Sequence, residues 1–363
     1  MKDNEGQHYV AKVLIFSDIH LHNWAYGSTY INGWNSRLLD QKKVCDQIVD
    51  LTRLHRVDYV VCGGDVFHTH GRVEAGPLQV AGELFHSLLD EVKKRSGKVY
   101  CLKGNHDLGR ETSSVDWLKD LGVHVIDDVG VDTDIKAGFI SYCDDEETFD
   151  RRRDILNAAS LEYWFCHQGV KYTPVGSDFV IPNEFLSSDK LPSTQDFKMC
   201  YTGHYHSPHW AADKLIIIGS PMQLNWSDSG ETRGCIILDT FNDGNERYDL
   251  NAPKFVALDG ALQPIPVHIL QDKRSEEIAV AGNFIKVLDE IPPIFMEEVR
   301  QKLKDAGARS VEFAFKQPTS RIGMAPTTFD IKDLISRYEK LNKVDDNGHE
   351  IGQRLRSGEY SCV

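Results

Sequence analysis

The sequence of 363 residues lacks any long hydrophobic run. Its beginning, MKDNEGQHYVAKVLIFSD, has no apolar stretch long enough for the core of a signal peptide, and no later segment approaches an uncharged membrane span. We therefore expect a cytoplasmic protein without a membrane partner. A hydrophobic content of 41% over this length is enough for one large core and a smaller appended unit.

The sequence also lacks paired cysteines. None of the eight belongs to a CxxC motif, and most lie singly within apolar, strand-like runs. This pattern is typical of reduced core thiols and not of disulfides or zinc ligands. The eight are Cys45, Cys62, Cys101, Cys143, Cys166, Cys200, Cys235 and Cys362.

Positive charge is scarce as well, with 41 basic against 55 acidic residues and a formal net charge of −14. A protein that holds DNA over a broad basic surface is disfavoured, because non-specific affinity comes largely from Lys and Arg beside phosphates. Two arguments weaken this exclusion. Carboxylates that bind divalent cations count as negative although the loaded site is locally positive, and a partner can supply the DNA contacts.

Up to about residue 240, short apolar runs alternate with polar or amphipathic segments, which is typical of a layered α/β protein. Helical spacing of apolar residues predicts helices at about 36–55 and 78–95, between the first three strands. This alternation indicates parallel pairing at the start. The predicted strands are 13–18, 57–65, 98–107, 137–143, 161–169, 198–204, 214–220 and 233–240.

Beyond residue 255 the pattern changes to one βαβ unit, with strands at 283–291 and 310–316 around a helix at 294–308. Two prolines precede this helix and a glycine lies at its end, in agreement with the residues that start and stop helices. A further helix is predicted at about 329–342, followed by a polar tail.

Polar residues of metal-ligand types end one apolar run after another. In α/β sheets the carboxyl ends of the strands meet at one edge, where ligands bind. Each motif alone has an ordinary explanation: an isolated Asp-x-His is a common accident, GNHD can be a polar turn, and GHYH can be a structural histidine pair. The ordered series is not explained in this way, and it predicts one shared site. Its residues are Asp18 and His20 in SDIH, Asp65 in GGD, Asn105, His106 and Asp107 in GNHD, His167 in CHQG, and His204 and His206 in GHYH.

This series resembles the five motifs of the calcineurin-like metallophosphoesterases, over about residues 13–221. The resemblance implies a four-layer α/β/β/α sandwich and two metal ions. The first ion would be bound by Asp18, His20 and His206, the second by Asn105, His167 and His204, and Asp65 would bridge both. His106 would face the scissile phosphate, stabilising the transition state or protonating the leaving oxygen, and Asp107 would orient it.

The chemistry of such a site does not depend on the family name. Two divalent cations about 3.5–4 Å apart can clamp a phosphodiester, lower the pKa of a water molecule and offset charge on the leaving oxygen. Oxygen and imidazole ligands without a thiolate suit Mn²⁺, Mg²⁺ or Fe²⁺, and we expect Mn²⁺. Proton donation to the leaving oxygen needs a group that titrates near neutrality, and His106 is the candidate.

Within the superfamily, three features resemble the DNA nuclease subunit SbcD. GGDVFH is similar to the GGDLFH of that group, which implies that His68 approaches the substrate backbone beside the metals, although an ordinary loop histidine can also stand there. GSPMQLNWSD (219–228) is similar to the Gly-Ser-Pro segment that ends the SbcD core, or it is a plain turn. The third feature is the βαβ unit, which resembles a small α+β capping domain that narrows the DNA channel.

The resemblance implies three parts: a nuclease domain at 1–250, a capping domain at 251–318, and a linker with a partner-binding helix and polar tail at 319–363. The expected partners are DNA, an SbcC-like coiled-coil ATPase of the SMC family and a second copy of the chain. The expected setting is the cytoplasm of a bacterium or of a phage-infected cell. The helix at 329–342 can dock on the ATPase or pack on its own domain, since amphipathicity alone does not decide.

The sequence departs from the family pattern after the first motif, where His22 stands in place of the usual glycine. His22 can bind phosphate, or it can be an exposed loop histidine. Four other histidines fit no motif, and we interpret them as ordinary surface or core residues. These are His70, His86, His124 and His209.

Three functions remain open. The first is a Mn²⁺-dependent nuclease of DNA repair and recombination, with 3′→5′ exonuclease activity on duplex ends and single-strand endonuclease activity. The second, favoured by the acidic charge, is a small-molecule or cyclic-nucleotide phosphodiesterase or phosphatase. The third is a scaffold that holds two ATPases together. The complete ligand set speaks against pure scaffolding, because a scaffold has no need for His106 beside seven metal ligands.

Overall fold

The structure is a computed structural model that describes residues 10–175, 179–181, 184–258, 280–288 and 293–314. All of these residues belong to one compact unit of the chain, residues 1–315. Two six-stranded sheets form its centre. None of the helices in the described part of the chain is long and apolar enough to span a membrane.

The first sheet has a parallel half and an antiparallel edge. β-branched and aromatic residues fill its central strands, as in VLIF and YVVC, and both of these segments are buried. Four strands run parallel in the order β1, β4, β5 and β6. On the other side of β1, β15 pairs antiparallel with β1, and β16 pairs antiparallel with β15. Their bounds are β1 Lys12–Phe16, β4 Tyr59–Cys62, β5 Lys98–Leu102, β6 His124–Ile126, β15 Gly234–Asp239 and β16 Gly244–Asp249.

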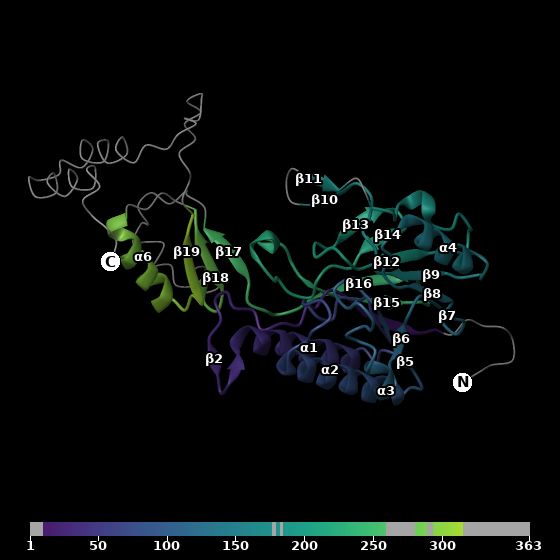
Figure 1. Ribbon diagram of the computed structural model, residues 1–363, viewed down its shortest axis with the longest axis horizontal. Helices are drawn as coiled ribbons and strands as arrows, with labels where there is room; N and C mark the ends of the chain where they lie inside the picture. Colours follow the sequence, from purple (N-terminus) through teal and green to yellow (C-terminus); the bar gives the residue numbers. More distant parts are fainter. Residues whose placement is uncertain (1–9, 176–178, 182–183, 259–279, 289–292, 315–363) are drawn as a thin grey trace, which may run out of the picture. The chain divides into compact units, whose positions relative to one another are not determined.

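Two 19-residue helices cover the outer face of this sheet, α1 (Ser36–Leu54) and α2 (Ala75–Lys93). Figure 1 shows them side by side. The side chain of Asn35 caps α1 by accepting from two backbone N–H groups of its first turn. Both helices place an apolar stripe against the sheet, so the helices predicted from spacing are confirmed. A short helix α3 (Leu118–Leu121) follows and ends at Gly122, whose φ of 99° suits glycine.

The second sheet repeats this plan with a thinner cover. Its order is β13, β14, β12, β9, β8, β7, and the middle four strands are parallel. One 12-residue helix, α4 (Glu146–Asn157), packs on its outer face through Phe149 and Leu156. The strands are β7 Val129–Asp132, β8 Ala137–Ile140, β9 Tyr163–Cys166, β12 Met199–Thr202, β13 His209–Ala212 and β14 Leu215–Ile217.

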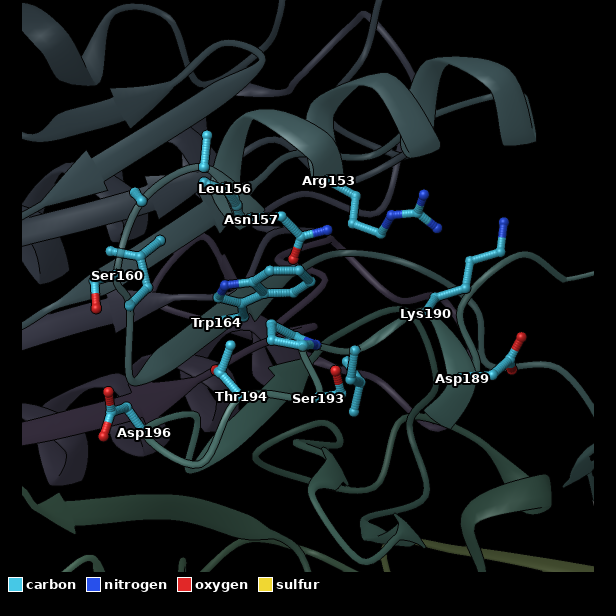
Figure 2. A pocket seen from close by; sticks show the side chains of 15 residues that line it. Arg153, Leu156, Asn157, Ser160, Trp164, Asp189, Lys190, Ser193, Thr194 and Asp196 are labelled. Carbon is cyan, nitrogen blue, oxygen red and sulfur yellow. The ribbon is translucent and has the colours of Figure 1, made fainter.

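A cavity of about 610 Å³ lies beside α4, on the outer side of the second sheet. Figure 2 shows the indole of Trp164 near its centre, with Arg153 and Lys190 to one side. Both cations are paired with carboxylates, including Asp150. None of the residues predicted to carry chemistry lines this cavity.

The inner faces of the two sheets pack on each other. The side chains between them include Ile15, Val61, Phe139, Phe165 and Tyr201, all buried. With helices outside each sheet, the layers run α/β/β/α, and the predicted fold class is confirmed. All eight strands predicted from apolar runs are present.

The region after the second sheet forms a small parallel sheet in the order β17, β18, β19, with α6 connecting the last two. This is the predicted βαβ unit, and it has its own small core. The domain boundaries at 250 and 318 stay predictions. The helix predicted at 329–342 lies outside the described residues. The bounds are β17 Phe255–Leu258, β18 Phe284–Val287, α6 Pro293–Asp305 and β19 Ser310–Phe313.

The remaining elements are short and lie in connections. All seven cysteines within the described residues are free and buried, as predicted, and Cys362 lies outside them. The connecting elements are the strand pair β2 Tyr30–Ile31 and β3 Trp34–Asn35, the strand pair β10 Thr173–Val175 and β11 Phe179–Ile181, and the 3₁₀ turns η1 Ser188–Lys190 and η2 Trp226–Asp228.

Candidate metal centre

The structure brings all seven predicted metal ligands together at the carboxyl ends of parallel strands from both sheets. The first sheet contributes Asp18 and His20 after β1, Asp65 after β4 and Asn105 after β5; the second contributes His167 after β9 and His204 and His206 after β12. This convergence is the arrangement expected where the strands of an α/β sheet end.

The first group consists of Asp18, His20 and His206. Nε2 of His20 lies 3.1 Å from Nε2 of His206 and 3.9 Å from Oδ1 of Asp18. Asp18 and His20 are buried, whereas His206 is partly exposed. One atom from each residue can therefore contact the same cation.

The second group consists of Asn105, His167 and His204. Oδ1 of Asn105 lies 3.3 Å from Nε2 of His167 and 3.0 Å from Nδ1 of His204. Asp65 stands between the groups, because its Oδ2 lies 3.5 Å from Nε2 of His20 and 3.5 Å from Nε2 of His167. The geometry thus has two ligand groups that share one carboxylate.

The side-chain atoms that face one another in these two groups are suited to bind cations. Nδ1 of His167 lies 2.6 Å from the carbonyl oxygen of Gly63, and because a carbonyl only accepts, this nitrogen carries the hydrogen. Nε2 of His167 faces the oxygens of Asn105 and Asp65, so either a proton on this nitrogen or a cation can lie between them. Acceptors this close repel unless positive charge lies among them. The residues therefore fit two divalent metal ions, with oxygen and imidazole ligands.

The pKa shifts of the histidine ligands also indicate a site that favours a bound cation. Burial lowers the pKa of His20 well below its usual range, and burial together with the His167 imidazole lowers the pKa of His204 to about 4. Both rings are therefore neutral at pH 7 and keep a lone pair. Burial opposes protonation of His167, but the Asp65 carboxylate outweighs it and raises the pKa to about 10. A divalent cation would satisfy Asp65 in place of that proton.

The ligand loops have an unusual backbone. Asp18, His20, Asp65 and His204 have φ angles of 55°, 48°, 52° and 84°, in the left-handed region that costs non-glycine residues free energy. Hydrogen bonds between loops hold them there. Asp18 N–H donates to the carbonyl of Gly64, and His204 N–H donates to the Asp18 carboxylate at 3.1 Å. Asp18 therefore links the two sheets.

His106 lies beside the two groups, but its orienting contact differs from the one that the family resemblance implied. Nδ1 of its ring lies 2.6 Å from the carbonyl oxygen of His68. The carboxylate of Asp107 instead accepts from the backbone N–H groups of Val66, Phe67 and Gly104. Asp107 therefore fixes the loops around His106 and does not contact its ring among the recorded hydrogen bonds.

His68 lies next to the centre, with its ring centroid 5.5 Å from those of His20 and His106. His22 and Trp24 pack against His68 at 5.1 and 4.4 Å, so the ring of His22 joins an aromatic cluster instead of standing free. His70, predicted to be ordinary, stacks on His106 at 4.4 Å. The motif analysis missed it because nothing in its local sequence marks this contact.

Two carboxylates missed by the sequence analysis lie behind the histidine ligands. Oδ1 of Asp228 is 3.8 Å from Nδ1 of His206, and Oε1 of Glu184 is 3.9 Å from Nε2 of His204. Such outer partners orient a ligating histidine and raise its basicity. Asp228 belongs to the Gly-Ser-Pro segment, in which Ser220 N–H also donates to the carbonyl of His206. That segment supports the site and is more than a turn.

Comparison with known proteins agrees with this geometry. Residues 11–215, more than half of the chain, match the family model described as calcineurin-like phosphoesterase. The chain is 25% identical over 246 residues to the protein 244L of Invertebrate iridescent virus 6, which its name describes as a phosphoesterase; the match covers 62% of this chain and 81% of the relative.

Two solved structures are also similar. A dimetal phosphatase from Danio rerio is 13% identical, with a TM-score of 0.38, covering 63% of this chain and 92% of the other. YfcE, a phosphoesterase from E. coli, is 14% identical, with a TM-score of 0.32, covering 66% and 100%. On the family match over residues 11–215, the chain belongs to the calcineurin-like phosphoesterases, which hydrolyse phosphoesters with bound metal ions.

Proposed function

We propose that the protein is a Mn²⁺-dependent DNA nuclease of the SbcD type, with 3′→5′ exonuclease activity on duplex ends and endonuclease activity on single strands. The observation that carries this proposal is the position of His68 in GGDVFH. Its imidazole stands against both His20 and His106, where a phosphodiester held by the ions would pass.

The roles of the residues follow from their hydrogen bonds. When bound, a pair of divalent ions supplies the Lewis acidity that neutralises phosphate charge and helps water to ionise. His106 keeps its Nδ1 hydrogen on the carbonyl of His68, which leaves Nε2 for the substrate. In its imidazolium form, Nε2–H donates to the leaving oxygen. Asp65 holds the backbone of His106 through Oδ1 at 2.9 Å and so couples this ring to the ligand set.

The choice of Mn²⁺ rests on the ligand atoms. The two groups offer carboxylate, amide and imidazole donors, and no described cysteine is among the candidate ligand groups. Such a set suits Mn²⁺, with Mg²⁺ and Fe²⁺ as the alternatives. Activity with each metal alone, added to metal-free protein, ranks the three.

The proposed nuclease acts together with protein partners. A net charge of −14 argues against a large basic DNA surface on this chain, because phosphate contacts come from Lys and Arg. We therefore assign much of the DNA grip to an SMC-like coiled-coil ATPase, and expect the chain to act as a homodimer in the cytoplasm. Pull-down of that ATPase by the full chain, and its loss on deletion of residues 329–342, tests this part.

A substrate panel tests the function. Purified full-length protein with Mn²⁺ is given end-labelled duplex DNA, single-stranded circular DNA, a cyclic nucleotide and a phosphate monoester, with and without the ATPase. We expect both DNA substrates to be cleaved and the small esters to react slowly. Untouched DNA in the presence of the ATPase would contradict the proposal.

One observation favours a second candidate, a small-molecule phosphodiesterase or phosphatase. The chain is acidic, and long polyanions are repelled by such a surface at low ionic strength. Rapid turnover of the cyclic nucleotide or the monoester by the isolated chain, with DNA intact, would select this function.

A further inference from the structure

Gln41 is a buried polar residue that no motif includes. It lies on the second turn of α1 and is 1% exposed. A glutamine amide carries two N–H donors and one carbonyl acceptor, and burial without partners would be unfavourable. The hydrogen-bond partners of Gln41 therefore show why a glutamine is buried at this position.

All three recorded hydrogen bonds of Gln41 go to the backbone of the first ligand loop. Its Nε2 donates to the carbonyls of Ile19 and His20, at 3.0 and 2.8 Å. Its Oε1 accepts from the N–H of His22 at 3.0 Å. One side chain thus contacts the residue before the metal ligand His20, His20 itself, and the residue two positions after it.

The opposite side of the same loop is held by the second motif. The N–H groups of Asp18, His20 and Leu21 donate to the carbonyls of Gly64, Asp65 and Val66. His20 stands between these two sets of bonds with a φ of 48°, a conformation that needs outside support in a residue other than glycine. Gln41 supplies that support from α1.

We propose that Gln41 is a positioning residue for the metal ion bound by Asp18, His20 and His206. It fixes the loop so that Nε2 of His20 points at Nε2 of His206. The inference rests on the metal-site assignment in the proposed function and does not depend on DNA being the substrate. Its removal lowers the affinity for this ion and leaves the ion of Asn105, His167 and His204 in place.

The same helix contains a matched control, Gln47. Its Nε2 donates to the carbonyls of Asn251 and Lys43, at 2.9 and 3.1 Å, and its Oε1 accepts from Asn251 N–H at 2.8 Å. Gln47 therefore makes the same kind and number of backbone hydrogen bonds, but away from the ligand loops. A substitution there reports the cost of losing such bonds without the metal site.

The experiment is a calorimetric titration of metal-free, full-length protein with Mn²⁺ alone. Methionine replaces each glutamine in turn, because it is unbranched and of similar length but cannot make these hydrogen bonds. For Gln41→Met we expect one of the two ions to bind roughly 10–100-fold more weakly, the usual effect of losing an outer partner of a ligand. The other ion keeps its affinity, and Gln47→Met keeps both.

A second variant keeps the test sharp if Gln41→Met folds poorly. Gln41→Glu retains the acceptor for His22 N–H but replaces the donors to the two carbonyls, and we expect the same selective weakening. Equal weakening of both ions, or no weakening in either variant, would overturn the role of Gln41. Failure of the unaltered protein to bind two ions would overturn the metal-site assignment and this inference with it. If Gln41→Met shows the selective loss but the unaltered protein, with Mn²⁺ and the ATPase, leaves DNA intact, only the nuclease proposal would be overturned.

Discussion

The two six-stranded sheets use the same plan but contribute differently to the site. The first sheet supplies Asp18 and Asp65, the two carboxylates, together with Asn105 and His106. The second supplies His167, His204 and His206, and no carboxylate among the seven. The loops of the first sheet are also joined to one another, through the hydrogen bonds of Asp107.

The helical layers outside the two sheets also differ, and the first sheet has the more complete cover. Two long helices cover the first sheet with a continuous apolar core, whereas the second is covered by α4 and adjoins the cavity at Trp164. We infer that the first sheet forms the more tightly packed base of the site and that the second contributes imidazole ligands to it. Substitutions on the two sheets should therefore differ in their effects on metal binding, activity and stability.

The largest effect is expected for Asp65→Ala, which removes the carboxylate shared by both ligand groups. Both ions should be lost, and the fall in phosphoesterase activity should exceed the roughly 100-fold seen for an outer partner of a ligand. Elemental analysis and a phosphodiester assay measure these outcomes. Asp90→Ala, at an exposed position on α2, is the control. Retention of one ion would show that Asp65 does not bridge.

The next effect is expected for His106→Asn, on the same sheet. Turnover should fall by roughly 10²–10⁴-fold, the usual range for a group that transfers a proton in the transition state. Metal content should stay at that of the unaltered protein, because His106 is placed beside the ligands and not among them. His86→Asn, 70% exposed on α2, is the matched control. Loss of an ion would make His106 a ligand and refute its separate role.

The smallest effects are expected on the free energy of unfolding, from one substitution in the outer layer of each sheet. Phe85→Ala on α2 opens a void in the continuous core and should cost near the top of the roughly 3–5 kcal/mol range for such changes. Trp164→Ala should cost near the bottom, because water in the adjoining cavity can fill the space. Its indole Nε1 has no recorded partner among the described residues, so no hydrogen bond is lost. Urea denaturation measures both, and an equal or larger cost at Trp164 would refute the contrast.

The sequence predicted the strands and long helices well because each has a clear apolar pattern. It placed strand ends too late: β1 ends at Phe16 and β4 at Cys62, whereas the predictions ran to 18 and 65. Asp18 and Asp65 adopt left-handed backbone angles, and this terminates the strands before the motif residues. Residue types alone do not reveal these backbone angles, so the strand ends could not be predicted from the sequence.

Elements with few buried residues were missed. Only Phe149 and Leu156 are buried on α4, so its apolar periodicity is too weak to detect. The edge strand β16, GNERYD, is polar and partly exposed for a similar reason. Both become ordered through tertiary packing that a local pattern does not contain.

For the site, the sequence predicted which residues meet but not what holds them. The ligands follow strand ends, so their convergence could be inferred from parallel pairing. Gln41, Glu184 and Asp228 act across long separations in the chain and have no spacing signal. The direct contact of Asp107 with His106 was implied by family resemblance, and the structure replaces it with backbone contacts.

The left-handed angles of the four ligand residues have a consequence for ion capture. Each such residue costs roughly 1–3 kcal/mol, and the folded core carries that cost before any ion arrives. The ligands are therefore ordered in advance, so that an incoming ion gains the full strength of its bonds without first arranging a loop. The loop also loses little conformational freedom when the ion binds, so little of the binding free energy is spent on ordering it.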